Sequence, residues 1–550
     1  MDQFLAKLKI AGFKGHVDTT DKTLELYSHD ASMFELRPTV VVTPQNSQDV
    51  QILVKQAGAA KKAMPQLSLT ARSAGTDMSG GAINDSAIVD FSRGFTKIKE
   101  ITSTSAHVEP GVFYRDFEPK TFEHDALLPS FPASRELCTV GGMVNNNSGG
   151  EKSLEFGKTE NFVTELQVIF ADGKEYTVKP LDRRQLVAKM SQKSYEGKLY
   201  KQTFELIEKN YDAIKAAKPH VTKNSTGYNL WDVWDRQTGI FDLTKLIVGA
   251  QGTLGFVTDI HFKLVPTTKF SGVLVCFMKT QDQLGEIINT VMDHSPATFE
   301  SFDNYTLELS IKFFFYFRKT LGYKKLAKLA IQLLPDLFLL ARGIPKLILL
   351  IEFTAQTQQE VDDKLDAMRT SLKPFKLEAT EDDNTEAKAW KFRIMRRESF
   401  NLLRKKVKDK HTAPFIDDLV VPTEHLPEFL PRLRKIIDKY KLLATVAGHM
   451  GDGNFHVIPL MKLDDPKERA KILPCMKEVN ELVLKYNGSL SGEHNDGLIR
   501  GPWLGQMYGP KVLKIFKETK HIFDPEDLFN PHKKADANWD YSFSHIRKSF

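Results

Sequence analysis

The sequence predicts an α+β protein in which mixed strands and helices form more than one domain. Short β-branched runs such as Thr39–Thr43 and Leu67–Arg72 alternate with helical segments such as Val50–Ala60. No internal repeat with a period of about 20–50 residues is visible, which argues against solenoids and propellers. A chain of 550 residues suggests two to four domains, at roughly 100–200 residues per domain.

In the N-terminal half, turn or capping signals follow the predicted elements. Residues 1–35 are expected to form a short helical lead-in. Asn46 and Ser47 supply capping side chains before the helix at 50–60, and Asp172-Gly173 marks a turn between two β-type runs. The strands are predicted at residues 39–43, 67–72, 88–91, near 108–110 and at 163–171.

From about Phe270 a new alternation of strands and helices begins. This pattern suits a second sheet domain with helices on one face. The predicted strands lie at residues 272–277, 346–353 and 444–447, and the predicted helices at 282–292, 358–372 and 426–440.

Composition excludes several classes of protein. The hydrophobic fraction of 41% and charged fraction of 27% are ordinary for a globular protein, so collagen-like and disordered chains are excluded. The net charge of +6 is uneven: Lys312–Lys346 and Glu386–His411 each carry about +7, so the remainder carries about −8. A chain of this kind is not a nucleic-acid-coating protein, and we expect no nucleic acid partner.

The three cysteines, Cys138, Cys276 and Cys475, are too few for a disulfide framework or a four-thiolate iron–sulfur site. The N-terminus has no apolar region of signal length, and no run of about 18 apolar residues predicts a membrane span. We therefore expect a cytoplasmic protein, with peripheral contact at the inner membrane face as an addition.

Two Gly-rich segments carry candidate metal ligands. Two histidines, His449 and His456, flank the Gly-Asp-Gly turn of GHMGDGNFH, and the later segment SGEHNDG adds Glu493 and His494. Two histidines and a carboxylate form a common catalytic site for a divalent metal. The alternative is a set of unrelated surface histidines in polar loops.

Two other tracts are rich in glycine, asparagine and serine. Ala71–Ala82 lacks the G-x-G-x-x-G order of dinucleotide-binding folds, yet its glycines would let backbone N–H groups approach a pyrophosphate. Pro129–Ser134, Thr139–Gly150 and Phe156–Gly157 form the second tract. So much glycine in an ordered domain indicates close packing of backbone on a ligand.

Together these segments resemble the vanillyl-alcohol-oxidase/PCMH superfamily of FAD enzymes. The resemblance is nearest to its D-lactate dehydrogenase, glycolate oxidase GlcD-like and D-2-hydroxyglutarate dehydrogenase group, and it runs from about Arg37 to Lys533. The motifs that carry it are RSAGTDMSGGA, PASxxxxTVGGMVNNNSGG, GAQGTLGFVTDI, GHMGDGNFH, SGEHNDGLIR and FNPHKK.

The resemblance implies a domain order. It predicts a PCMH-type FAD-binding domain of two α/β subdomains at 36–269. A cap or substrate domain at 270–425 would hold an antiparallel sheet covered by helices, with a basic aromatic insertion at about 305–345. A C-terminal segment at 426–550 would carry the metal and active-site motifs and return to the FAD domain.

The resemblance also implies the site residues. FAD is expected to bind without a covalent link, because the first Gly-rich loop contains no histidine. His449, His456 and Glu493 would bind a divalent Zn, Mn or Fe ion, and His494 would act as the neighbouring base. The implied cofactor-binding residues are Arg72, Ser73, Ala74, Gly75, Thr76, Asp77, Met78, Ser79, Gly80, Pro129, Ser134, Thr139, Gly141, Gly142, Asn145, Asn146, Ser148, Gly149, Gly150, Gly157, Gly252, Thr253, Gly255, Val257 and Asn530.

The implied activity is that of an FAD-dependent dehydrogenase oxidising a D-2-hydroxy acid, with D-lactate to pyruvate as the best guess. The metal would assist deprotonation of the hydroxyl, hydride would pass to flavin N5, and a separate quinone, cytochrome, electron-transfer flavoprotein or iron–sulfur subunit would accept the electrons. The alternatives are a glycolate or D-2-hydroxyglutarate dehydrogenase and a transferase like alkyl-glycerone-phosphate synthase. A non-catalytic protein that binds a membrane or partner is a third class.

The substrate carboxylate needs a cation, and Arg393 in the segment Trp390–Arg393 is the first candidate, since guanidinium binds carboxylate bidentately. The alternative is a solvated basic helix face. Ile416 stands where some 2-hydroxyglutarate enzymes have a lysine, which favours a monocarboxylate. Three further departures from the family pattern are Gln251, Asn495 and His532.

The stretch Lys312–Arg342 lies outside the family pattern. It joins a Phe-rich run to leucines at helical spacing beside lysines. Such a segment can lie in a membrane interface, or it can form a helical subdomain that packs on the cap.

Overall fold

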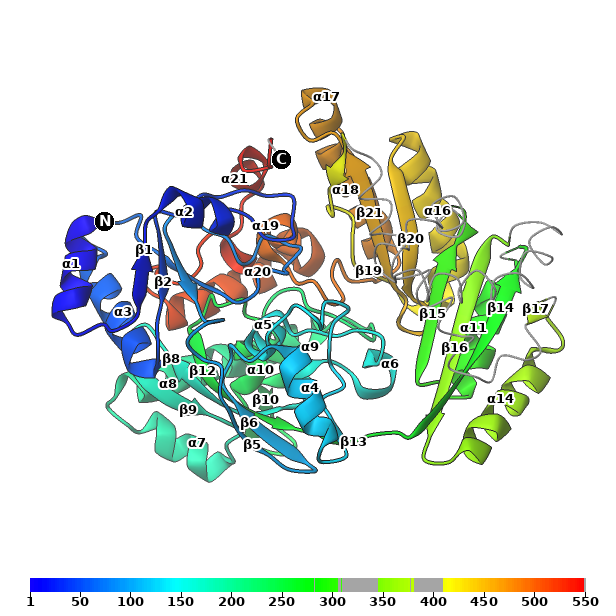
Figure 1. The fold of residues 1–550 in the computed structure, drawn as a ribbon, viewed down its shortest axis with the longest axis horizontal. Helices are drawn as coiled ribbons and strands as arrows, with labels where there is room; N and C mark the ends of the chain where they lie inside the picture. Colours follow the sequence, from blue (N-terminus) through cyan, green and yellow to red (C-terminus); the bar gives the residue numbers. More distant parts are fainter. Residues whose placement is uncertain (281, 305–307, 309–344, 376, 380–408, 549–550) are drawn as a thin grey trace.

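The computed structural model describes residues 1–280, 282–304, 308, 345–375, 377–379 and 409–548. Figure 1 shows two lobes, one built from the N-terminal residues and the C-terminal end, the other from the residues between them. The chain crosses from the first lobe to the second after β13 (Val265–Pro266). The predicted insertion at 305–345 lies almost entirely outside the described residues.

The first sheet has the strand order β1-β2-β4-β3. Its strands are β1 (His16–Asp18), β2 (Val40–Thr43), β3 (Leu69–Arg72) and β4 (Ala87–Asp90). β4 pairs in parallel with both β2 and β3, and helix α3 (Ser47–Ala60) provides the crossover from β2 to β3. Asn46 caps that helix by accepting from the N–H of Asp49 at 3.0 Å, as its sequence indicates.

The predicted helical lead-in is only partly helical. It contains α1 (Asp2–Ile10) and α2 (Asp21–Tyr27), but β1 lies between them and pairs with β2. The first sheet therefore begins before residue 36, ahead of the predicted start of its domain.

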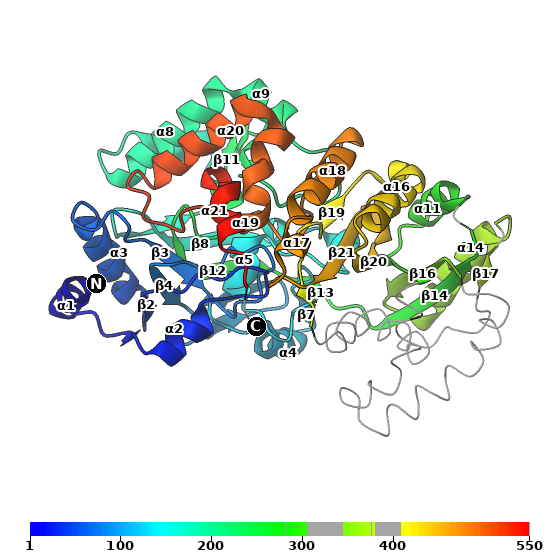
Figure 2. The same cartoon turned by 90° about the horizontal axis from the view of Figure 1, so that it is seen from above.

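The second sheet is antiparallel, with the order β5-β6-β12-β8-β9. One face of it packs into an apolar core, and the other carries polar side chains. Helices α8 (Tyr195–Lys209) and α20 (Leu504–Phe523) lie side by side in this lobe (Figure 2), which brings the C-terminal end back to it. The strands are β5 (Ile98–Ile101), β6 (Ser105–Val108), β8 (Val163–Ile169), β9 (Glu175–Val178) and β12 (Phe256–Lys263).

The second lobe is built on an eight-stranded antiparallel sheet whose main path is β17-β14-β16-β15-β20-β21-β18, with β19 paired to β21 beside it. Its short strands are β17 (Glu378–Ala379), β18 (His411–Thr412) and β19 (Leu419–Val420). Its long strands are β14 (Phe270–Met278), β15 (Thr298–Asp303), β16 (Leu347–Ala355), β20 (Leu443–His449) and β21 (Asn454–Met461). Four helices pack on it through apolar side chains: α11 (Leu284–Asp293), α14 (Gln358–Leu372), α16 (Leu426–Lys439) and α18 (Ile472–Lys485). The predicted boundary at residue 425 falls inside this sheet, since β20 and β21 pair with strands before it.

The predicted α+β class and the antiparallel cap sheet are confirmed. Among the described residues, no helix combines the length and apolar character needed to cross a membrane.

Candidate active site

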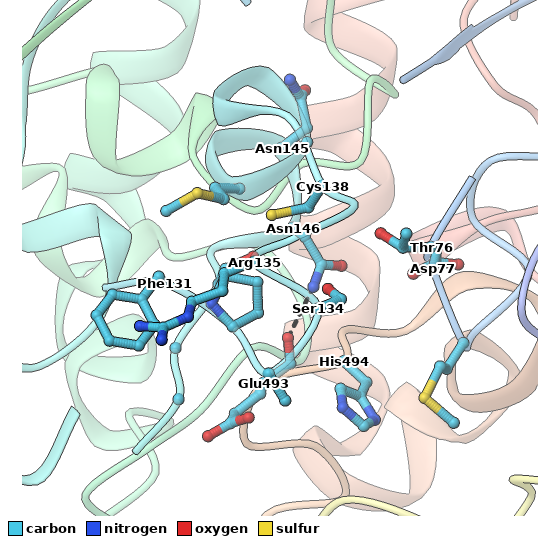
Figure 3. Close-up of a pocket in the computed structure, with 18 of the residues that line it drawn as sticks. Thr76, Asp77, Phe131, Ser134, Arg135, Cys138, Asn145, Asn146, Glu493 and His494 are labelled. Atoms are coloured by element: carbon cyan, nitrogen blue, oxygen red, sulfur yellow. Dashed lines mark hydrogen bonds between the residues drawn. The ribbon is translucent and has the colours of Figure 1, made fainter. Parts of the chain in front are cut away.

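A cavity of about 620 Å³ lies where the two lobes meet. Its first wall comes from the loop after β3 and from the tract at 131–150. The strands of the eight-stranded sheet form another wall, and Glu493 and His494 lie between them (Figure 3). A cavity of this size suits a cofactor or another small ligand.

The loops that line this cavity are shaped by glycine. Gly75 has φ +68°, and a Cβ there would lie 2.3 Å from the Arg72 guanidinium. At Gly150 a Cβ would lie 2.3 Å from the carbonyl oxygen of Phe131. Larger residues would therefore distort both loops, which explains the glycines that the sequence pattern singled out.

The loop after β3 presents free backbone donors. The N–H groups of Gly75, Thr76 and Met78 have no hydrogen-bond partner among the described residues. Asp77 folds the loop by accepting from the N–H of Ser79 at 3.1 Å and of Gly81 at 2.6 Å. Unpaired N–H groups on a concave loop fit an anion such as a pyrophosphate, so this loop fits the cofactor that the family resemblance implies.

Sixteen of the 25 residues expected to bind cofactor line the cavity. Those that do so are Arg72, Ser73, Gly75, Thr76, Asp77, Met78, Ser134, Gly141, Gly142, Asn145, Asn146, Ser148, Gly149, Gly150, Gly252 and Val257. The others, Ala74, Ser79, Gly80, Pro129, Thr139, Gly157, Thr253, Gly255 and Asn530, do not line it.

Arg72 is one of these sixteen residues, and its guanidinium holds the loop in place. It donates to the carbonyl oxygen of His29 at 2.9 Å and to those of Tyr27 and Ala82 at 3.4 Å. The Arg72 side chain therefore ties the loop to Tyr27 and His29, which precede strand β2 in the chain.

Asn530 lies beneath the cavity and joins three of the loops that shape it. Its side-chain amide donates to the carbonyl oxygens of Gly81 at 2.8 Å and Gln251 at 2.7 Å, and its carbonyl accepts from the Thr70 hydroxyl at 2.9 Å. Asn530 thus holds the surroundings of the cavity together and does not itself line it.

The predicted metal ligands meet at the cavity. Nε2 of His449 lies 3.2 Å from Oε1 of Glu493, and Nε2 of His456 lies 4.0 Å from Oε2 of the same carboxylate. One ligand atom from each of the three residues lies within 4.8 Å of the others. β20 ends at His449 and β21 contains His456, so the hairpin between them brings both rings to Glu493.

Two further carboxylates orient the imidazoles. Nδ1 of His449 donates to Oε1 of Glu300 at 2.5 Å, and Nδ1 of His456 donates to Oδ1 of Asp417 at 3.2 Å. An ionised carboxylate only accepts, so both rings keep Nε2 for Glu493 or for a metal. Carboxylates that hold the second nitrogen are typical of metal-binding histidines, and this donor set therefore fits a divalent ion.

The site carries an excess of buried negative charge. Burial alone would raise the pKa of Glu493, but the charges of Lys223 and His449 hold this pKa well below its usual range. Although burial lowers it, Glu300 raises the pKa of His449 to about 9. Lys223 lies 2.6 Å from Glu493 and 2.9 Å from Asp452, so a single lysine neutralises two of the acids. Such surroundings favour a bound cation.

His494 is held by two aspartates. Its Nδ1 donates to Oδ2 of Asp417 at 2.6 Å, and its backbone N–H donates to Oδ2 of Asp418 at 2.7 Å. Burial alone would lower the pKa of His494, but the charge of Asp417, with a smaller effect from Asp418, raises this pKa to about 9. Nε2 is left for the cavity, which His494 lines. Asp417 thus orients both His456 and His494.

Glu493 is also tied to the first lobe. The side-chain amide of Asn146, from α5 (Val140–Asn146), donates to the backbone carbonyl of Glu493 at 2.8 Å (Figure 3). Lys158 reaches the carbonyl of the preceding residue, Gly492, at 3.1 Å. The loop that carries Glu493 and His494 is therefore fixed by residues of the predicted cofactor tract.

Arg393 and the neighbouring basic residues lie outside the described residues. Ile416 is buried in the apolar core of the second lobe and does not line the cavity. The three departures from the family pattern, Gln251, Asn495 and His532, all have positive φ, at +52°, +65° and +64°.

Sequence reasoning missed the residues that orient the metal ligands. Glu300, Asp417, Asp418 and Asp452 were not among the predicted site residues. Asp418 accepts from the N–H groups of Glu493 and His494, and from the Ser491 hydroxyl. The adjacent acids of FIDDLVVP, placed between apolar residues, were the available signal, whereas Glu300 in β15 had none.

Two family models match the chain. The model described as FAD binding domain matches residues 38–179, and the one described as FAD linked oxidases, C-terminal domain matches residues 267–534. The two matches meet at the cavity, because each contributes residues that line it.

Several relatives match along nearly the whole chain. A D-2-hydroxyglutarate dehydrogenase of Pseudomonas putida is 27% identical over 96% of this chain, and a D-lactate dehydrogenase of Archaeoglobus fulgidus is 24% identical over 94% of it. A glycolate oxidase subunit GlcD of Bacillus subtilis is 24% identical over 92%. The chain spans 51% of the Pseudomonas protein, 98% of the Archaeoglobus protein and 91% of the Bacillus protein. It therefore has about half the length of the D-2-hydroxyglutarate dehydrogenase.

Solved structures share the fold. An alkyldihydroxyacetonephosphate synthase superposes with a TM-score of 0.66 at 13% identity, over 96% of this chain and 84% of that one. p-Cresol methylhydroxylase superposes with a TM-score of 0.64 at 16% identity, over 98% and 96%. These likenesses confirm the predicted PCMH-type fold. With both family models matching around one cavity, the chain belongs to the FAD-linked oxidases.

Proposed function

We propose that this protein is an FAD-dependent dehydrogenase that oxidises a D-2-hydroxy acid. The observation that carries the proposal is the opening of His449, His456, Glu493 and His494 into a cavity whose opposite wall fits FAD. A site that combines a flavin with a divalent cation suits substrates in which a hydroxyl and a carboxylate lie on adjacent carbons.

The chain's residues would hold both groups without further rearrangement of the loops. FAD would lie along the loop after β3 and the tract at 131–150, and it would accept hydride from the substrate. His449, His456 and Glu493 would hold a Zn, Mn or Fe ion, which would lower the pKa of the substrate hydroxyl. Glu300 and Asp417 keep the two imidazoles in the required orientation.

His494 is the base that the geometry supports. Asp417 holds its Nδ1 and Nε2 is left for the cavity, so the neutral form of the ring would accept the hydroxyl proton; because the pKa of His494 is raised to about 9, this form would predominate only at alkaline pH unless a bound cation lowers that pKa. The ion pair with Asp417 would stabilise the imidazolium that forms.

The proposed substrate is small, with D-lactate as the first choice. On the second-lobe side, none of the described residues that line the cavity is a lysine or arginine, so none of these residues would bind a second carboxylate through a permanent positive charge. The described residues on that side are Val273, Thr298, Glu300, Leu350, Glu352, Thr445, Ala447, His449, His456 and Ile458. Arg393 stays a proposal for the first carboxylate. Glycolate and D-2-hydroxyglutarate, the latter named for the Pseudomonas relative, are the alternatives.

Electrons would leave to a separate acceptor: a quinone, a cytochrome, an electron-transfer flavoprotein or an iron–sulfur subunit. The three cysteines are buried at separate positions and cannot hold a cluster of their own. Contact of residues 305–345 with the cytoplasmic membrane face would bring the site near such an acceptor, and it stays a proposal.

An anaerobic flavin-reduction assay tests the proposal. The FAD-loaded protein is mixed with D-lactate, glycolate, D-2-hydroxyglutarate or their available L-isomers, and bleaching of the flavin band is followed. We expect reduction by one D-2-hydroxy acid and at least 100-fold slower reduction by His494→Ala with FAD still bound, on the scale of general-base catalysis of roughly 10²–10⁴-fold. A flavin that no hydroxy acid bleaches would favour the alkyl-glycerone-phosphate-synthase-like alternative.

A further inference from the structure

A second group of metal-ligating side chains lies away from the cavity, on the polar face of the five-stranded sheet. His107 lies on β6, and Asp259 and His261 lie on β12. One ligand atom from each residue lies within 4.8 Å of the others. None of the three lines the cavity.

Strand pairing fixes this arrangement. His261 lies directly opposite His107 in the antiparallel pair of β12 and β6, and Asp259 precedes His261 by two residues. Side chains two apart on a strand share a face, and directly opposite residues bring their Cβ atoms to about 4.5–5.5 Å. The intervening Ile260 is fully buried in the core below. The three donors are therefore placed by rigid backbone.

The donor atoms are already close to the spacing that a metal requires. The rings of His107 and His261 stack with centroids 3.9 Å apart, and Nε2 of His107 hydrogen-bonds to Oδ1 of Asp259. Tetrahedral zinc, with bonds of about 2.0–2.1 Å, separates its ligand atoms by roughly 3.3 Å.

The surroundings support a site that exchanges with solvent. The side chains of His107 and His261 are 27% and 37% exposed, whereas that of Asp259 is 8% exposed. Lys99 pairs with the second oxygen of Asp259, and Glu165 on β8 lies 3.9 Å from Nε2 of His261. Glu165 provides a fourth donor, which is the second carboxylate of the group, and Lys99 is the cation that a metal would displace.

We propose that His107, Asp259 and His261 form a second divalent-metal site, of the class that takes Zn²⁺, on the outer face of the predicted FAD-binding domain. Two imidazoles and one carboxylate on adjacent strands match the donor preference of this ion, and an open fourth position remains for water or Glu165. The bound ion would link β6 to β12. This site is independent of the activity proposed above.

Equilibrium dialysis of the FAD-loaded protein against Zn²⁺, with zinc measured by inductively coupled plasma mass spectrometry, tests the proposal. We expect the double variant His107→Asn/His261→Asn to bind one zinc per chain fewer than the wild type. The matched control His220→Asn replaces an exposed histidine elsewhere and should bind as the wild type does. Equal zinc content in the double variant and the wild type would overturn the proposal.

Two further measurements do not depend on that variant. Lys99→Met removes the cation that competes for Asp259, so zinc affinity should rise at least several-fold; weaker binding would count against the site. In the wild type, Zn²⁺ should protect His107 and His261 from diethyl pyrocarbonate, as read by peptide mass spectrometry, while His220 stays reactive. Unchanged labelling of both histidines at saturating Zn²⁺ would also reject the site.

Discussion

The hydrogen bond between Glu300 and His449 gives a sharp test of the cavity metal site. Both residues are buried, and the bond length is 2.5 Å. In Glu300→Gln the amide oxygen can still accept from Nδ1, but the negative charge that makes the imidazole a stronger ligand is lost. Substitutions of such carboxylates typically weaken metal binding about 10- to 100-fold, which corresponds to about 1.4–2.7 kcal/mol.

The assay is competition for Zn²⁺ against a chromophoric chelator, with FAD content measured on the same samples. The matched control is Glu352→Gln, because Glu352 lines the same cavity from β16 and accepts from the Thr298 hydroxyl at 3.2 Å. We expect the control to change zinc affinity less than about 3-fold, since it holds no ligand ring in the contacts described. Wild-type affinity in Glu300→Gln, or equal weakening in both variants, would refute the argument from ligand orientation.

Three other predictions concern buried groups around the cavity. Lys534→Met should lower the free energy of unfolding by about 3–5 kcal/mol in urea titrations, because Asp496, which is fully buried and lies 2.9 Å from Nζ, would lose its cation. The double variant Lys534→Met/Asp496→Asn should recover much of the loss, and a larger loss in the double variant would contradict this. Asn495→Gly should destabilise the protein by about 1–3 kcal/mol, although glycine adopts φ +65° easily. The reason is that the Asn495 side chain donates to the carbonyl oxygens of Asn146 and Gly249 and accepts from Lys534. A Gly variant as stable as the wild type would show that these hydrogen bonds contribute nothing to stability. Burial lowers the pKa of Lys533 to about 8, so between about pH 8 and 10.5 this residue binds fewer protons in the folded state than in the unfolded state, and its contribution to stability should rise with pH across that window. Because Lys158, whose pKa is also lowered to about 8, still contributes, the rise in Lys533→Met should be smaller than in the wild type by an amount on the order of 3 kcal/mol, and parallel pH profiles would contradict it.

Local sequence patterns predicted most of the regular elements. The helix expected at 358–372 is α14 (Gln358–Leu372), and the strand expected at 272–277 lies within β14. Such patterns are reliable because burial on one face sets the spacing of apolar residues along the chain. β1 was missed because its three residues are half-exposed and are defined only by their pairing with β2.

The residues that face the cavity could be predicted from the sequence, whereas the carboxylates that orient them could not. The motifs contain the residues that face the cavity, such as His449 and Glu493, within short Gly-rich segments. Their carboxylate partners come from distant strands: Glu300 is 149 residues from His449, and Asp417 is 77 from His494. Only the folded sheet brings these pairs together, so no local pattern could indicate them.

The unusual residues at 251, 495 and 532 show how sequence departures can keep a backbone shape. All three have positive φ, a conformation in which non-glycine residues are uncommon. Two of their side chains make contacts with other segments: the Gln251 side chain accepts from the N–H of Gly497 at 2.9 Å, and the His532 ring stacks on Tyr541 with centroids 4.0 Å apart. At residues 251 and 532, the side chain of a positive-φ residue is thus held by a contact with another segment of the chain.

The bond from the Asn146 amide to the Glu493 carbonyl has a thermodynamic consequence. Asn146 belongs to the wall that would hold the flavin, and Glu493 belongs to the cation site, so one hydrogen bond joins two binding equilibria. If occupation of one site tightens this contact, linkage requires that occupation of the other raises the first ligand's affinity by the same factor. The flavin and the ion would then bind cooperatively, and a chelator would loosen both.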